Sequence, residues 1–106
     1  MKRLLFICSQ NKLRSPTAEQ VFSTWPDIEV ASAGLNSDAE NPLTPELVIW
    51  ADIIFVMEKA HRTKLSTSIK AQLNGQRIVC LDIPDRYQFM DETLVRILGE
   101  RVPKFL

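Results

Sequence analysis

The sequence predicts a small three-layer α/β sandwich, in which a four-stranded parallel sheet carries helices on both faces. Four short runs are apolar throughout, as strands buried on both sides are, instead of alternating with polar residues. Stretches with helical spacing lie between these runs, and strands that alternate with helices form parallel sheets with right-handed crossovers. The four runs are Leu4–Ile7, Ile28–Ala31, Ile53–Met57 and Ile78–Leu81.

The first helix is expected soon after the first apolar run. Ser15 is a suitable N-cap residue, and Pro16 suits the first helical position. An apolar stripe at positions i, i+3, i+4 and i+7 would face the sheet. This stripe consists of Ala18, Val21, Phe22 and Trp25, so Trp25 is expected in the core.

Three more helices are predicted by a capping side chain, by apolar residues three or four apart, and by a stop signal. The second begins with Thr44 as its cap and Pro45 behind it, and Gly75 would end the third. Asp91 would cap the fourth, and Pro103 would end it. Their apolar positions are Leu47, Val48 and Trp50, then Leu65, Ile69 and Leu73, and finally Leu94, Ile97 and Leu98.

Length and composition predict one domain over residues 1–106. Thirteen basic and 13 acidic residues give no net charge, which argues against a nucleic-acid partner. No apolar run is long enough for a membrane span or a secretory signal, so we expect a cytoplasmic protein without a membrane partner. Cys8, Cys80 and His61 have no zinc spacing, and we expect neither a metal nor a cofactor. Cys80 is expected in the core, and His61 in a local supporting role.

The segment between Cys8 and Arg14 carries the first sign of chemistry. Ligands of such sheets bind beyond the carboxyl ends of the strands, and Cys8 lies at the carboxyl end of the first predicted strand. A C-x5-R loop can turn successive backbone N–H groups inward to bind an oxyanion, and the following helix adds its positive end. Arg14 can bind two oxygens of the same group. The same field stabilises a thiolate, so Cys8 is the predicted nucleophile. The predicted phosphate-binding residues are Ser9, Gln10, Asn11, Lys12, Leu13, Arg14 and Ser15.

A thiolate beneath a bound phosphate would attack phosphorus and form a thiophosphate intermediate, which water then hydrolyses. The departing oxygen needs a proton donor. Asp85 follows Pro84 on a predicted loop at the same edge of the sheet and is the first candidate, whereas Asp82 lies nearer the strand end and is the alternative. Tyr87 would either form a wall of the substrate site or pack in the core.

The segment "CSQNKLRSPTAE" resembles the signature loop of the low-molecular-weight protein tyrosine phosphatases, which carry C-x5-R-[ST] near the N-terminus. The resemblance continues in "ASAGL", "ADIIFVMEKAHRTKL" and "IPDRY" and therefore covers most of the chain. It implies that Asn11 and Ser32 support the loop, that Ser15 assists the thiolate as a leaving group, and that Asp85 is the general acid. It also implies a phosphorylated protein or a small phosphate ester as substrate.

The resemblance implies a short, divergent member of this family. Gln10 stands where the family usually has glycine, Leu13 where a second cysteine often follows, and Arg86 where proline is usual. Lys12 replaces a small or branched residue, and the difference in length falls between residues 34 and 51. Basic Lys12 and Arg86 near the mouth predict a more anionic substrate than plain phosphotyrosine.

Two other functions are compatible with the same loop. The substitutions at Gln10, Lys12 and Arg86 leave open an oxyanion-binding regulatory module without turnover. An arsenate reductase would bind its substrate in a similar loop, but it would relay electrons through further cysteines, and the chain offers only Cys80. Phosphotyrosine, phosphoarginine and other phosphate esters are all possible substrates, and the oligomeric state is open.

Overall fold

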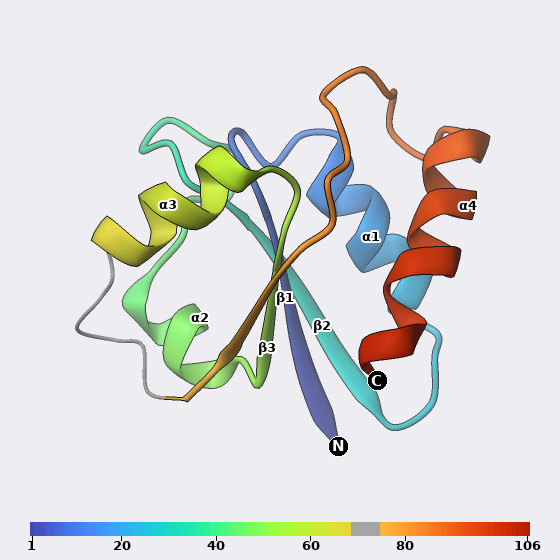
Figure 1. Ribbon diagram of the computed structural model, residues 1–106, viewed down its shortest axis with the longest axis horizontal. Coiled ribbons are helices and arrows are strands. Elements are labelled where there is room, and N and C mark those ends of the chain that lie inside the picture. The colour runs from blue at the N-terminus through green and yellow to red at the C-terminus, as the bar shows by residue number, and fades with distance from the viewer. Residues whose placement is uncertain (69–74) are drawn as a thin grey trace.

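The computed structural model describes residues 1–68 and 75–106. Its centre is a parallel sheet with the strand order β2-β1-β3-β4, so the first strand lies inside the sheet. Helices cover both faces, with α1 and α4 on one side and α2 and α3 on the other (Figure 1). The predicted three-layer architecture is confirmed. The strands are β1 (Lys2–Cys8), β2 (Ile28–Gly34), β3 (Ile53–Val56) and β4 (Arg77–Cys80), and the helices are α1 (Arg14–Phe22), α2 (Pro45–Trp50), α3 (Lys59–Ser68) and α4 (Glu92–Arg101), followed by the short 3₁₀ turn η2 (Pro103–Phe105).

Alternate residues of the central strands face two separate hydrophobic layers. Leu4, Phe6 and Phe55 point toward α1 and α4, where the ring of Phe6 stacks between those of Phe22 and Phe55. Leu5, Ile7 and Ile54 point toward α2 and α3. Because β1 and β3 are buried on both sides, their sequences are apolar without alternation. The carboxyl end of β1 is thereby held rigidly at one edge of the sheet.

Several helix signals act as expected. The side chain of Thr44 accepts a hydrogen bond from Leu47 N at 3.2 Å and caps α2. The side chain of Asp91 accepts one from Thr93 N at 2.8 Å and caps α4. Pro103 follows the end of α4 closely and begins η2. Of the third predicted stripe, Leu65 is buried, whereas Ile69 and Leu73 lie outside the described residues.

The prediction for the start of the first helix was wrong. The helix α1 begins at Arg14, with Leu13 in the N-cap position and no side-chain cap, so Ser15 already lies inside it. The Ser15 hydroxyl is engaged by the preceding loop instead of by the helix backbone. Trp25 lies beyond the end of α1 at Phe22 and is 39% exposed, because the helical period that would bury it has ended. Its ring meets only the edge of the core, at Phe22.

Cys80 and Trp50 are less buried than expected. Both are partly exposed and pack against the layer beneath α2 and α3. Cys80 ends β4, which is an edge strand of the sheet and therefore has a neighbouring strand on one side only.

None of the helices in the described ranges is long and apolar enough to cross a membrane.

Candidate active site

The loop between β1 and α1 forms the floor of the site. Cys8 is the last residue of β1 and is 4% exposed, and Arg14 is the first residue of α1. Between them, Asn11 has a φ of 56°, a left-handed conformation that Asn tolerates better than most residues. This conformation reverses the chain within six residues, so that the backbone curls around the thiol. Asn11 N lies 3.2 Å from Cys8 Sγ and donates to it.

The Cys8 thiol shares a proton network with Ser15 and Asn11. Cys8 Sγ lies 2.9 Å from Ser15 Oγ, which also lies 2.9 Å from Asn11 Oδ1. A serine hydroxyl has only one proton to donate. When the thiol is protonated, Ser15 can accept from sulfur and donate to Asn11. When sulfur is a thiolate, the Ser15 proton can turn toward it. The network therefore accommodates both charge states of Cys8.

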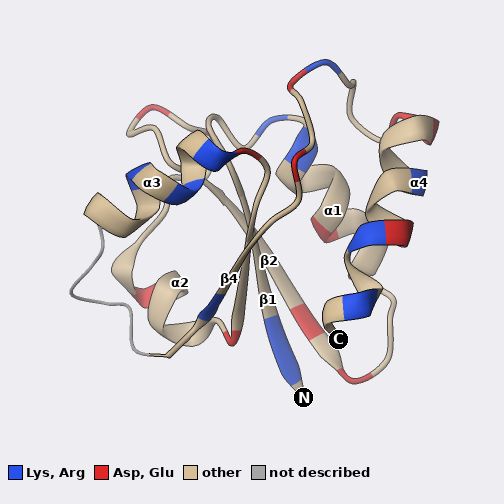
Figure 2. Cartoon of the chain, viewed as in Figure 1, with Lys and Arg blue, Asp and Glu red and all other residues tan. Residues whose placement is uncertain are grey.

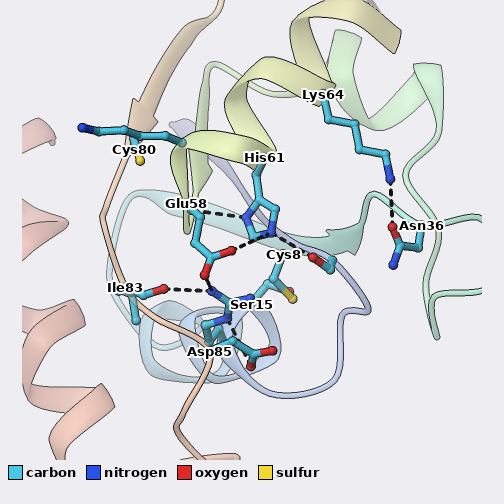
Figure 3. Close-up of polar contacts among 12 residues, drawn as sticks. Cys8, Ser15, Asn36, Glu58, His61, Lys64, Cys80, Ile83 and Asp85 are labelled. Atoms are coloured by element: carbon cyan, nitrogen blue, oxygen red, sulfur yellow. Dashed lines mark hydrogen bonds and ion pairs between the residues drawn. The ribbon is translucent and has the colours of Figure 1, made fainter.

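Arg14 is 3% exposed, and the three residues that contact its guanidinium group, Glu58, Ile83 and Asp85, are labelled in Figure 3. Its Nη1 donates to the Ile83 carbonyl at 2.8 Å and lies 3.2 Å from Glu58 Oε1. Its Nε lies 3.7 Å from Asp85 Oδ1. These contacts fix the guanidinium plane, while the two N–H donors of Nη2 are left for an oxyanion. Nothing in the sequence near Arg14 indicates Glu58 as its partner, because Glu58 follows β3 and is distant in the chain.

A hollow of about 140 Å³ lies over the loop, which is large enough for a tetrahedral oxyanion. Asp85 borders it and is 65% exposed, on the segment that follows β4. Asp82 does not border it and instead accepts a hydrogen bond from Cys80 Sγ at 3.4 Å. The geometry thus favours Asp85 over Asp82 as the proton donor. The lining residues of the hollow are Cys8, Ser9, Gln10, Lys12, Leu13, Arg14 and Asp85.

His61 supports the loop from behind. It is 4% exposed on α3, and its Nε2 lies 2.9 Å from Ser9 Oγ. Because its Nδ1 accepts a hydrogen bond from Glu58 N at 3.2 Å, the proton of the neutral ring is on Nε2, which donates to Ser9. Burial lowers the pKa of His61, and the positive charge of Arg14 lowers it further. A neutral His61 therefore ties Ser9 to the start of α3, as the expected supporting role requires.

The segment after β2 braces the other side of the loop. Leu35 N donates to the Cys8 carbonyl at 2.9 Å, Asn36 N to the Ser9 carbonyl at 3.0 Å, and Glu40 N to the Gln10 carbonyl at 3.1 Å. These bonds turn three loop carbonyls away from the hollow, which an oxyanion requires. A side chain at Gly34 would come within 2.8 Å of the Ser9 carbonyl oxygen, so only glycine allows this approach.

Two predicted site residues lie elsewhere. Tyr87 is buried in the layer beneath α1 and α4 and does not line the hollow, because the chain turns it inward beneath the Arg86 guanidinium, 5.6 Å from the ring centre. The packing interpretation therefore accounts for Tyr87, and the substrate-wall interpretation does not. The Ser32 hydroxyl donates to Glu19 Oε1 at 2.5 Å and makes no direct hydrogen bond with the loop.

Sequence reasoning missed Glu58 and Gly34. Glu58 opens the charged segment "EKAHRTK" and contacts both Arg14 and His61. The available signal was its position directly after a buried strand, at the edge where ligands bind. Gly34 likewise ends β2 at that edge, beside Cys8 in the strand register.

A buried thiol inside a curled loop, an arginine above it and a carboxylate across a small hollow define the class of cysteine-dependent phosphatases. Residues 3–51 match the family model described as low molecular weight phosphotyrosine protein phosphatase. The match covers just under half of the chain and contains the whole loop from Cys8 to Arg14. No curated protein sequence is significantly similar to it.

Several solved structures are similar to this chain over nearly its whole length. Wzb from Vibrio vulnificus, in complex with benzylphosphonate, is 25% identical, with 98% of this chain and 96% of that chain covered and a TM-score of 0.78. The tyrosine phosphatase Wzb from Escherichia coli K30, in complex with phosphate, is 19% identical, with 98% and 95% covered and a TM-score of 0.79. The YwlE arginine phosphatase from Geobacillus stearothermophilus is 22% identical, with 99% and 95% covered and a TM-score of 0.74. Because their sequence identities are below 25%, the last two similarities establish the fold only.

Proposed function

We propose that this protein is a phosphomonoesterase of the protein-tyrosine-phosphatase type that acts through Cys8. The observation that carries the proposal is the arrangement of Cys8 Sγ, Arg14 and Asp85 around one hollow of about 140 Å³. The loop amides and the Arg14 guanidinium would hold the equatorial oxygens of the phosphoryl group, whose charge they stabilise in the transition state. They also supply the positive potential for which other phosphatases use metal ions, so we propose a metal-independent reaction.

In the first step, the Cys8 thiolate attacks phosphorus and the P–O bond to the alcohol breaks on the opposite side. Asp85 gives its proton to the departing oxygen. The exposed position of Asp85 at the mouth of the hollow supports this role, because the leaving group points outward there. In the second step, Asp85 takes a proton from water, which attacks phosphorus and releases Cys8. A hydrogen bond from Ser15, 2.9 Å from Sγ, would stabilise the thiolate as it leaves.

We further propose a phosphorylated protein or small phosphate ester as the substrate and the cytoplasm as the place of action. A nucleophilic thiol must stay reduced, and both Cys8 and Cys80 are free. Lys12 lines the hollow and is exposed, which supports the prediction of an anionic group near the scissile phosphate. An unchanged ratio of rates on mono- and multiply phosphorylated substrates in Lys12→Ala would contradict this point.

The arsenate reductase alternative gains no support from the site. In the strand register, Cys80 of β4 lies beside Val56 of β3, which lies beside Ile7 of β1. Cys80 is therefore two strands away from the end of β1. Two strand spacings are about 10 Å, beyond the reach of a disulfide without backbone movement. Burial also raises the pKa of the Cys80 thiol, which disfavours the thiolate that a relay needs.

The test is the hydrolysis of p-nitrophenyl phosphate in excess EDTA. The parent protein should turn over, Cys8→Ser should abolish turnover, and Asp85→Asn should lower kcat by about 10²- to 10⁴-fold. Asp82→Asn is the matched control and should retain the parent rate, because Asp82 does not border the hollow. A parent protein that binds phosphate or vanadate without any turnover would instead be a regulatory module.

A further inference from the structure

Basic side chains gather at the β4 edge of the sheet, where the proposed catalysis does not use them. Lys59, Arg62 and Arg77 line a hollow of about 670 Å³, whose lining contains one acidic residue, Asp82. Figure 2 shows blue segments along α3 and on β4, and both elements border this hollow. The chain as a whole has no net charge, so this excess of positive charge is local. We call this hollow the cationic hollow.

The basic groups of the cationic hollow are not neutralised. Within the described residues, neither Lys59, Arg62 nor Arg77 forms an ion pair with a carboxylate, and residues 69–74 contain no Asp or Glu. Arg62 Nη2 instead donates to the Ile78 carbonyl at 3.1 Å, and the Arg77 guanidinium lies 5.0 Å from the centre of the Phe105 ring. These neutral contacts orient two guanidinium groups while leaving their charge free. An incoming anion therefore meets donors that are already in place.

The positive region extends along the same edge. An adjoining hollow of about 250 Å³ shares Asp82 and Phe105 with the cationic hollow and adds Arg101 and Lys104. Arg101 donates to two backbone carbonyls, at 2.6 and 3.0 Å, and so also keeps its charge unneutralised. Five basic side chains thus border two adjoining hollows that contain one carboxylate.

A third hollow, of about 450 Å³, lies between this region and the residues that hold Arg14. It shares Lys59 and Asp82 with the cationic hollow. Its lining also includes Glu58 and Ile83, the two residues that contact Nη1 of Arg14. A substrate segment that leaves the catalytic hollow beside Arg14 would reach the β4 edge through this third hollow.

We propose that the cationic hollow binds an acidic segment of the phosphorylated protein substrate, at some distance along its chain from the phosphate. The proposal rests on the proposed phosphatase function. It is carried by the unneutralised guanidinium groups of Arg62 and Arg77 and by the adjoining hollow that extends to Glu58 and Ile83, which contact Arg14. Carboxylate side chains match the fork of arginine donors, and several of them complement the local charge.

Binding is tested first, without catalysis. Fluorescence anisotropy measures the affinity of a labelled oligoglutamate peptide for the parent protein, for Arg62→Gln/Arg77→Gln, and for Arg96→Gln, which removes an exposed arginine of α4 outside these hollows. We expect about tenfold weaker binding in the double variant, no change in Arg96→Gln, and weaker binding in high salt. Equal affinity of the parent and the double variant would overturn the proposal, as would tighter binding of an RNA oligonucleotide than of the peptide.

Kinetics then connect the hollow with the substrate. Phosphotyrosine peptides carry Glu on the N-terminal side, Glu on the C-terminal side, or Gln on both sides. We expect one Glu peptide to exceed the Gln peptide in kcat/KM by about tenfold, and Arg62→Gln/Arg77→Gln to remove this advantage while leaving p-nitrophenyl phosphate hydrolysis unchanged. A parent protein that does not hydrolyse p-nitrophenyl phosphate refutes the phosphatase function. Hydrolysis with equal rates on Glu and Gln peptides refutes the docking of acidic segments.

Discussion

Replacing Gly34 with alanine tests how the phosphate-binding loop is held. Gly34 ends β2 beside Cys8, and the following segment donates its N–H groups to the carbonyls of the loop. An added Cβ at position 34 would lie 2.5 Å from Ala39 Cβ, 2.8 Å from Ser9 O and 3.0 Å from the Gln10 carbonyl carbon. Two of these three contacts are with the backbone of the loop itself. The methyl group therefore cannot be accommodated by rotation of a side chain.

The distances set the size of the expected effect. Carbon atoms in ordinary contact are about 3.5 Å or more apart, so the contact with Ala39 is about 1 Å too short and that with the loop backbone about 0.5 Å too short. Overpacking of this kind costs about 1–3 kcal/mol in the free energy of unfolding. A displacement approaching 1 Å in a catalytic loop lowers kcat by up to about 10²-fold. We expect Gly34→Ala to reduce kcat about 10- to 100-fold.

The assay compares kcat for p-nitrophenyl phosphate and the free energy of unfolding in urea. Gly99→Ala is the matched control, because nothing lies within 4 Å of a Cβ at that position of α4, and helix propensity predicts a gain of about 1 kcal/mol. Combining Gly34→Ala with Ala39→Gly removes the shortest contact but leaves those with the loop, so kcat should stay low. Parent-like kcat in Gly34→Ala, or full recovery of kcat in this double variant, would refute the reasoning.

Three further predictions concern other contacts of the same structure. Glu58→Gln weakens the hold on Arg14 and should lower kcat/KM about three- to tenfold, whereas parent-like kinetics would show that the Ile83 carbonyl suffices. The lowered pKa of His61 means that the unfolded chain binds a proton at a higher pH than the folded protein does, so the free energy of unfolding should fall as the pH drops below about 6.5. Urea titrations at several pH values should find this slope in the parent and a reduced one in His61→Gln, and equal slopes would contradict it. Asp91→Ala removes the cap of α4 and should cost about 1 kcal/mol of stability, measured as a lower Tm, with activity unchanged; an unchanged Tm would mean that the cap contributes nothing.

The layers of the fold could be predicted because the residues of each strand indicate by themselves that the strand is buried. Runs that are apolar on both faces can only lie inside a covered sheet, and β1 and β3 do so. The Cys8–Arg14 loop could be predicted for the same reason, since the nucleophile, the backbone nest and the arginine are all near neighbours in the chain. The helix boundary was less certain, because Ser15 satisfies the local signal for a cap but finds better partners in Cys8 and Asn11.

The sequence by itself determined the parallel α/β sheet, the edge where the site lies, and the thiol and guanidinium of the loop, because these depend on residues close together in the chain. Only the tertiary structure decided what surrounds them. Glu58 contacts Arg14, His61 contacts Ser9, and the missing side chain of Gly34 leaves room for the loop backbone. These residues meet because crossover connections bring the carboxyl ends of four strands to one edge of the sheet. Tyr87 turned into the core for a related reason: whether an aromatic ring faces a substrate or the interior depends on the space that other elements leave for it.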